Sequence, residues 1–329
     1  MAPGRYRIYG LSLRSDLPLP ELVPITGTRP TRTDLELRLG EAAAGARGAT
    51  RRRWTLPISE PQRADLAASG ILPIHIGQDR YGDFADMHWP ALGRCVVRDG
   101  RRITVLPAPG TSEAAIRLWV LGPIIGLVLH LRGWLVLHGS GIEMTAGTAI
   151  AVLGASGQGK STTAALLVAR GHRLVADDLV AIPPARRNKG LTTIPGFPQL
   201  KLWPDAAAAI THAADSLPRL IPEEDKRAHR LPEQFAPGPL PLAAIYLLDP
   251  STDAAGHAAE PLTPADACIE LIRNAFGART FDHMDRARRF TQIARVASCI
   301  PVYRLRVRRG FAHLGELADL IESTNGRFV

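Results

Sequence analysis

The sequence predicts an α/β protein whose larger part is built on a mainly parallel sheet with flanking helices. Two observations carry this prediction. From residue 130 to residue 329, short apolar runs alternate with longer amphipathic segments, as strands alternate with crossover helices. One such run, Ala149–Leu153, is followed at once by a glycine-rich turn and a helical segment that begins near Thr162. Before residue 110 short alternating runs dominate, which predicts a small β-rich domain.

A chain of 329 residues favours two domains, and we place them at residues 1–110 and 111–329. Within the first domain, Tyr6–Tyr9 and Leu35–Leu39 alternate as half-buried strands do. The stretch from Arg94 to Val105 is typical of a β-hairpin, because Asp99 and Gly100 at its centre suit a tight turn.

The second domain is expected to begin with a helix from Thr111 to about Leu131, bent at Gly122-Pro123. Its most apolar run, Leu118–Leu129, is shorter than the roughly 20 residues that cross a bilayer, so we predict a buried helix and no membrane anchor. Two short strands, Trp134–Leu137 and Gly141–Met144, should follow it and lead into Ala149–Leu153.

The glycine-rich turn is the most informative motif of the chain. It fits the pattern G-x-x-x-x-G-K-[ST] at every fixed position. Its glycines allow backbone N–H groups to turn toward an anion, and the helix N-terminus adds its positive dipole end. Lys160 would reach the β- and γ-phosphates of a nucleotide and the Ser161 hydroxyl would bind Mg²⁺, so ATP and Mg²⁺ are the expected cofactors. The predicted phosphate-binding residues are Gly154, Ala155, Ser156, Gly157, Gln158, Gly159, Lys160, Ser161 and Thr162.

Two adjacent carboxylates, Asp177 and Asp178, end a short apolar strand soon after the loop helix. This compact strand–loop–helix–strand unit places both acids next to the phosphate loop. One of them can support Mg²⁺, and the other can take a proton from an attacking hydroxyl group. The residues alone do not decide which acid does which.

Further strands are expected at 242–248 and 302–307, and helices at 263–276, 282–297 and 314–323. The polar, proline-rich stretch 218–239 suits either a mobile loop over a site or a solvated linker.

Composition limits the classes of partner and compartment. The net charge is +9 and the pI about 10.1, but the arginines are scattered, which indicates a basic surface with room for an anionic peptide and does not indicate nucleic-acid binding. The three cysteines are far apart, so no disulfide framework or zinc site is expected. Free thiols and the absence of a signal-peptide pattern at Met1–Gly10 predict a cytoplasmic protein.

Three motifs in order resemble the catalytic core of the HPr kinase/phosphorylase family: Leu137-His138-Gly139, the glycine-rich loop, and Arg170 to Asp178. The resemblance implies that the loop binds ATP and that His138 assists near the transferring phosphoryl group. It also implies that Asp178 is the base that deprotonates a protein serine, and that Asp177 supports the metal. Catalytic roles therefore fall on Asp178, His138 and Lys160, and metal binding on Ser161 and Asp177. A homo-oligomer is a further implication.

The glycine-rich signature and basic loop that follow the aspartates in HPr kinases have no counterpart here. Residues 195–204 (PGFPQLKLWP), with the opening YRIYGL, resemble instead a divergent branch of HPr-kinase-related serine kinases. Some members of that branch phosphorylate ribosomal precursor peptides, including lasso peptide precursors. The resemblance thus implies a kinase that transfers the γ-phosphate of ATP to a serine of a peptide or protein.

Three alternatives stay open from the sequence. The chain could be an HPr kinase/phosphorylase that acts on HPr, a kinase for a small hydroxylated molecule, or a nucleotide-binding scaffold without transfer activity. Lys201, Lys226 and Arg227 could also lie near the substrate, although no motif indicates this.

Overall fold

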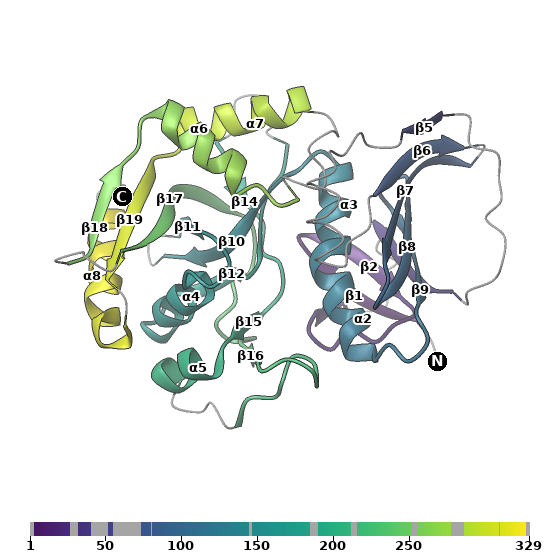
Figure 1. The fold of residues 1–329 in the computed structure, drawn as a ribbon, viewed down its shortest axis with the longest axis horizontal. Coiled ribbons are helices and arrows are strands. Elements are labelled where there is room, and N and C mark those ends of the chain that lie inside the picture. Colours follow the sequence, from purple (N-terminus) through teal and green to yellow (C-terminus); the bar gives the residue numbers. More distant parts are fainter. Residues whose placement is uncertain are drawn as a thin grey trace. The chain divides into compact units, whose positions relative to one another are not determined.

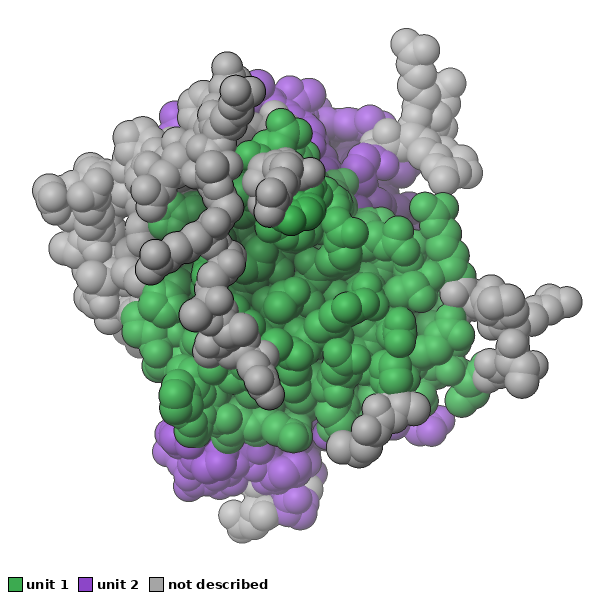
Figure 2. Space-filling view, turned by 90° about the vertical axis from the view of Figure 1, so that its right-hand side faces the viewer, with its two compact units in different colours: residues 1–132, 279–284 green, residues 133–278, 285–329 purple. Residues whose placement is uncertain are grey.

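The computed structural model describes residues 3–26, 32–40, 52–54, 74–79, 81–144, 147–184, 190–211, 216–251, 256–277, 286–308 and 310–326. The chain forms two compact units, coloured separately in Figure 2: unit 1 is Met1–Arg132 with Arg279–Met284, and unit 2 is Gly133–Ala278 with Asp285–Val329. The units divide after the apolar helix, whereas the sequence placed a boundary before it, near residue 110. The division of the chain into two domains stays a prediction.

The described residues of unit 1 form a nine-stranded sheet and a long helix. Its strands run in the order β3-β1-β2-β4-β9-β8-β7-β6-β5. The helix passes through a π-helical stretch that contains Pro123, where the sequence predicted a bend. The elements are β1 (Gly4–Ile8), β2 (Leu11–Ser15), β3 (Val23–Pro24), β4 (Leu35–Leu39), β5 (Arg52–Trp54), β6 (His75–Asp79), β7 (Gly82–Trp89), β8 (Gly93–Arg98), β9 (Arg102–Pro107), α2 (Glu113–Trp119), η1 (Val120–Ile124) and α3 (Ile125–Leu131).

The predicted hairpin is confirmed as β8 and β9. Its turn uses positive φ at Asp99 (52°) and Gly100 (58°), which matches the right-handed twist of the paired strands. By length and hydropathy Glu113–Leu131 could cross a membrane, but 67% of its apolar window is buried inside the structure, as in a core helix.

Unit 2 is a mixed sheet with helices on both faces (Figure 1). The sheet order is β12-β10-β11-β17-β19-β18, with β13 beside β10 and β14 beside β17. Its elements are β10 (Leu135–Glu143), β11 (Ala149–Leu153), α4 (Lys160–Ala169), β12 (Arg173–Ala176), β13 (Leu179–Ile182), β14 (Thr192–Thr193), β15 (Gln199–Leu202), α5 (Pro204–Thr211), β16 (Arg227–Arg230), β17 (Leu240–Ser251), β18 (Ala258–Pro261), α6 (Pro264–Arg273), α7 (Arg286–Cys299), β19 (Val302–Arg308), η3 (Phe311–His313) and α8 (Leu314–Asn325).

The α/β class is confirmed, but the strand directions differ from the expected mainly parallel sheet. Parallel pairing joins β11 to β17 and β17 to β19, at the centre of the sheet. The outer pairings with β10, β12, β13 and β18 are antiparallel. The apolar runs of buried parallel and buried antiparallel strands look alike in sequence, so the direction of pairing was not encoded in them.

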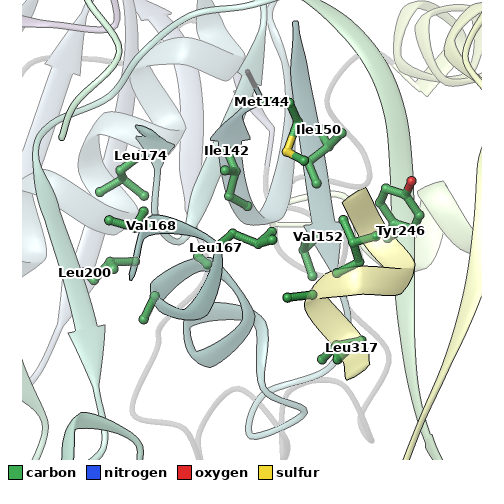
Figure 3. Close-up of a cluster of buried hydrophobic side chains, with 14 of the residues drawn as sticks. Ile142, Met144, Ile150, Val152, Leu167, Val168, Leu174, Leu200, Tyr246 and Leu317 are labelled. Atoms are coloured by element: carbon green, nitrogen blue, oxygen red, sulfur yellow. The ribbon is translucent and has the colours of Figure 1, made fainter. Parts of the chain in front are cut away.

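Period-2 alternation along the central strands divides their side chains between two cores. In β11, Ile150 and Val152 face α4, α5 and α8, while Ala151 and Leu153 face α6 and α7. Figure 3 shows the first core, in which Leu167 of α4 and Leu317 of α8 lie against these strands. The helix after the glycine-rich loop is therefore held by apolar burial on the sheet.

The two short strands predicted before β11 are one strand, β10. Its residue Gly139 pairs with Leu153, and a Cβ added at Gly139 would lie 2.6 Å from the carbonyl oxygen of Val152. The glycine therefore marks a close approach of two backbones and does not mark a turn.

We expect Gly139→Ala to lower the free energy of unfolding by about 1–3 kcal/mol, because the backbone of β11 cannot move away without breaking its own pairing. Chemical denaturation measures this. Gly315→Ala in α8 is the matched control, because a Cβ there meets nothing within 4 Å; it should be neutral or slightly stabilising. Equal stability of Gly139→Ala and wild type would contradict the close approach.

Candidate active site

The glycine-rich loop, the two aspartates and His138 meet at one edge of the unit 2 sheet. Gly139 of β10 pairs with Leu153, the residue before the loop, and His138 pairs with Leu179, the residue after the aspartates. Strand β10 thus lies between the two motifs and fixes the distance between them. The antiparallel pairing of β10 with β11 and β13, which the sequence does not reveal, therefore brings the site residues together.

The loop closes onto the N-terminus of α4. Gly157 (φ 79°) and Gly159 (φ 96°) adopt left-handed backbone, which side-chain-bearing residues rarely do, and no side chain caps the helix. The first-turn N–H groups of an uncapped helix lack intrahelical partners. Such a helix end can bind an anion with its backbone donors and its dipole.

Lys160 is 8% exposed, and its ammonium donates to two loop carbonyl oxygens, those of Gly154 (2.9 Å) and Ala155 (3.0 Å). Burial lowers the pKa of Lys160 below its ordinary value, although both aspartates favour its charged form. Among the described residues, the direct partners of this ammonium group are therefore neutral carbonyl oxygens of the loop.

Asp177 is a buried carboxylate held by donors from three elements. Its Oδ1 accepts from Ser140 Oγ (2.7 Å) of β10 and from Ser161 Oγ (3.0 Å) of α4, and its Oδ2 accepts from the backbone N–H of Lys201 (2.9 Å) in β15. Burial and the neighbouring Asp178 charge raise the pKa of Asp177, and the hydrogen bonds from Ser140 and from the Lys201 backbone oppose the rise. The carboxylate lies behind Ser161 and fixes that hydroxyl group.

Asp178 adopts φ of 71°, an uncommon conformation for a residue other than glycine. Its carbonyl accepts from Gly139 N–H (3.1 Å), and its carboxylate forms an ion pair with Lys201. Burial opposes its charged form, but the ammonium of Lys201 outweighs this and holds the pKa of Asp178 below its ordinary value. Asp178 is therefore an ionised carboxylate at neutral pH, and its side chain is 32% exposed.

His138 points into the same space. Burial lowers the pKa of its imidazole below the ordinary value, and the positive charge of Lys160 adds to this. The ring is therefore neutral at pH 7 and offers one donor and one acceptor nitrogen.

A cavity of about 630 Å³ joins these groups. Its volume suits a nucleotide-sized molecule. The candidate residues on its wall are His138, Ser156, Gly157, Gln158, Gly159, Lys160, Ser161, Thr162 and Asp178. Gly154 and Ala155 lie on a neighbouring cavity of about 400 Å³ instead, and Asp177 lies on neither wall.

Four further residues belong to this region. Ser140 holds Asp177, Lys201 pairs with Asp178, and Trp203 and Lys226 line the cavity. Sequence reasoning placed Lys201 and Lys226 near a substrate only as a guess, and it passed over Ser140 and Trp203. A histidine followed two residues later by serine on one strand was a weak signal for Ser140.

Comparison with known proteins relates the part of the chain around the glycine-rich loop to one family. Residues 131–196 match the family described as HPr Serine kinase C-terminal domain. Two curated relatives, both named HPr kinase/phosphorylase and from two strains of Treponema pallidum, are each 56% identical over 74 residues, or 22% of this chain. Each match spans 21% of the relative's length, about a fifth.

Among solved structures, that of the Hpr(Ser) kinase/phosphatase from Coxiella burnetii aligns with a TM-score of 0.33 and 12% identity, over 58% of this chain and 97% of that one. The segment that matches the family contains β10, the loop, α4 and both aspartates, whereas Lys201, Trp203 and Lys226 of the site lie beyond it. Over this segment the chain is similar to HPr kinase proteins.

We expect Lys201→Met to destabilise the protein more at pH 7 than at pH 4. In the wild type, the pKa of Asp178 is lower in the folded protein than in the unfolded chain, where it is about 3.9. The ionised Asp178 therefore stabilises the fold at pH values above the unfolded pKa, and this stability is lost as the pH falls through the folded pKa. Without Lys201, burial raises the pKa of Asp178, so its unpaired charge is costly at pH 7 and is removed by protonation at pH 4. The loss at pH 7 should be about 1–3 kcal/mol, since Asp178 keeps contact with water.

Denaturation in EDTA at both pH values measures this difference. Arg306→Met, which breaks the exposed ion pair with Glu260 (3.1 Å), is the control and should cost less than about 1 kcal/mol at either pH. A pH-independent loss in Lys201→Met would contradict the proposed state of Asp178.

Proposed function

We propose that this HPr-kinase-like chain is an ATP- and Mg²⁺-dependent kinase that transfers the γ-phosphate to a serine hydroxyl group of a peptide or protein. One observation carries the proposal: an ionised carboxylate, Asp178, faces the same cavity as the glycine-rich loop and its lysine. A phosphate-binding loop alone would support nucleotide binding. A loop with a base beside it supports transfer.

The residues of the loop fit a nucleoside triphosphate. Lys160 has a buried ammonium whose direct partners are two neutral carbonyl oxygens, and the first turn of α4 is uncapped. Phosphate oxygens supply the negative charge that both features lack. Lys160 would then leave the carbonyl oxygens and donate to the phosphates.

The residues beside the loop also fit Mg²⁺, which prefers oxygen ligands and keeps several waters. Ser161 offers its hydroxyl oxygen on the cavity wall. Asp177 Oδ1 accepts a hydrogen bond from Ser161 Oγ at 3.0 Å, which directs the lone pairs of the Ser161 oxygen away from Asp177. Ser161 would therefore bind the metal and Asp177 would orient Ser161 and supply negative charge behind it. ATP would supply the phosphoryl group, and Mg²⁺ would offset the charge of the phosphates.

In the transfer, Asp178 accepts the proton of the acceptor hydroxyl group on its carboxylate. The acceptor oxygen forms the new bond to the γ-phosphorus, and the bond from that phosphorus to the bridging oxygen of ADP breaks and leaves its electron pair there. His138, neutral and opposite Leu179, would donate a hydrogen bond to the transferring group. Positioning and charge stabilisation would supply most of the acceleration.

For the acceptor, we propose a ribosomal precursor peptide, including the lasso type. This finer proposal rests on the resemblance of residues 195–204 to the divergent kinase branch. A peptide acceptor also suits the exposed aromatic side chains at the cavity, Trp203 (51% exposed) and Phe311 (43%).

The decisive experiment incubates the protein with γ-labelled ATP, Mg²⁺ and the peptides and small proteins encoded beside its gene. Mass spectrometry then locates any added phosphate. Phosphoserine on a precursor peptide supports the proposal, and phosphoserine on an HPr protein favours the HPr kinase alternative. ATP binding with no phosphorylated peptide or protein would reject the proposal of a peptide or protein kinase in favour of a small-molecule acceptor or a nucleotide-binding scaffold.

Lys160→Ala should weaken ATP binding by about 100-fold or more, because the main charge on the phosphates is lost. Isothermal titration calorimetry with a non-hydrolysable ATP analogue measures the affinity. Thermal unfolding without nucleotide controls for folding. Unchanged affinity would show that the nucleotide binds elsewhere.

Asp178→Asn should keep ATP affinity within a few-fold and lower transfer by about 100-fold or more, because the amide cannot accept the proton. The same labelled-ATP assay and the same calorimetry measure both quantities. Transfer at the wild-type rate would rule out Asp178 as the base and leave the assignment to another group.

A further inference from the structure

Lysine is rare in this chain, although positive charge is common. Of 40 lysines and arginines, lysine occurs only at Lys160, Lys189, Lys201 and Lys226. Lys189 lies outside the described residues, and the other three all line the 630 Å³ cavity. An ammonium is a compact charge that can approach a single oxygen or an aromatic face, whereas a guanidinium is a broad planar fork. The placement indicates that each of these three ammonium groups has a specific partner.

Two of the three partners are already clear. Lys160 belongs to the phosphate loop, and Lys201 pairs with Asp178. Lys226 is different, because its ammonium lies over the ring of Trp203, 5.3 Å from the centroid. Among the described residues no carboxylate forms an ion pair with Lys226. A cation–π contact at a half-exposed ring is a weak interaction and leaves the ammonium able to bind an anion.

The register of β15 and β16 explains why this pair exists. Leu202, the last residue of β15, pairs with Arg227, the first residue of β16. The next position outward therefore brings Trp203 opposite Lys226. Trp203 directly follows the last residue of β15, and Lys201 lies two residues before it in that strand. The pair of Trp203 and Lys226 thus lies on the same cavity wall as Lys201 and Asp178.

The charges around the cavity favour an anion near Lys226. Lys201 is neutralised by Asp178, and Lys160 is expected to serve the nucleotide phosphates. The second acid on the wall, Asp205, has its Oδ1 bound to the backbone N–H of Ala206 (2.8 Å) at the start of α5. Of the three lysines on this wall, Lys226 is therefore the one left with neither a carboxylate partner among the described residues nor an expected role at the nucleotide phosphates.

We propose that Trp203 and Lys226 form an acceptor subsite that binds a carboxylate close to the hydroxyl group to be phosphorylated. This inference rests on the proposed kinase function. Two residues along an extended strand span about 6.6 Å, so an anion at Lys226 would lie within about two residues of a hydroxyl group at Asp178. The free C-terminal carboxylate of a terminal serine meets this requirement, and so does an acidic side chain next to an internal serine. The Trp203 ring would hold the ammonium in place and pack against the acceptor backbone.

The test uses acetylated serine peptides of otherwise degenerate sequence in four matched pools. Two pools end in serine, one as the free acid and one as the amide. Two have an internal serine, followed by aspartate in one and by asparagine in the other. The first pair detects recognition of a C-terminal carboxylate and the second detects recognition of an acidic neighbour. The protein should phosphorylate the charged member of at least one pair about tenfold or more faster.

Lys226→Met should remove that preference by lowering kcat/KM for the charged pool about 10- to 100-fold, with the KM for ATP unchanged. Lys226→Arg should restore part of it, and Trp203→Ala should weaken it while Trp203→Phe keeps most of it. Arg230→Met, at an exposed position of the same strand β16 outside the cavity wall, is the control and should leave the preference intact. Thermal unfolding of each variant checks that the fold is kept.

Equal phosphorylation of charged and neutral pools would overturn the subsite while leaving the kinase intact. A rise in the KM for ATP in Lys226→Met, with the peptide preference retained, would also overturn it and would assign Lys226 to the nucleotide. ATP binding without phosphorylation of any pool or of any neighbouring gene product would reject the proposed function, and the subsite with it.

Discussion

The hydrogen bonds to Asp177 are the constraint on which the site depends. One buried carboxylate collects donors from β10, from the first turn of α4 and from the backbone of β15. Buried carboxyl oxygens are stable only when such donors satisfy them, so the three elements must meet at this point for the protein to fold without a large penalty. The requirement fixes the loop helix, the strand before it and the Lys201 segment relative to one another.

The neighbouring Asp178 is placed by the same arrangement. Because the chain between β12 and β13 must keep Asp177 buried, the next residue turns through a positive φ and directs its side chain to the cavity. Two identical side chains in adjacent positions thus obtain different environments. One is enclosed and oriented by hydroxyl groups, and the other faces Lys201 and retains contact with water. Such a division suits one acid to a structural or metal-side task and the other to proton transfer.

The rest of unit 2 supports this edge of the sheet. Apolar side chains alternate along the central strands and bury α4 on one face and α6 with α7 on the other. Strand β10 has no side chain at Gly139, so it can approach β11 closely, and this approach carries His138 to the end of the loop. The two-stranded pair β15 and β16 adds Lys201, Trp203 and Lys226 to the cavity wall. The same strands therefore carry both the buried apolar side chains of the core and the polar side chains of the site.

The sequence by itself determined the α/β class, most strands and helices of unit 2, the phosphate-loop motif and the importance of the aspartate pair. These features are local: apolar periodicity, glycine spacing and capping residues act within a few positions of the chain. It did not determine that β10 is one strand, that the sheet is mixed, or that β16 exists. Nor did it establish that Ser140 holds Asp177 or that Trp203 faces Lys226. Those relations join residues 23 to 37 positions apart, and only the pairing register of the folded strands brings such residues into contact.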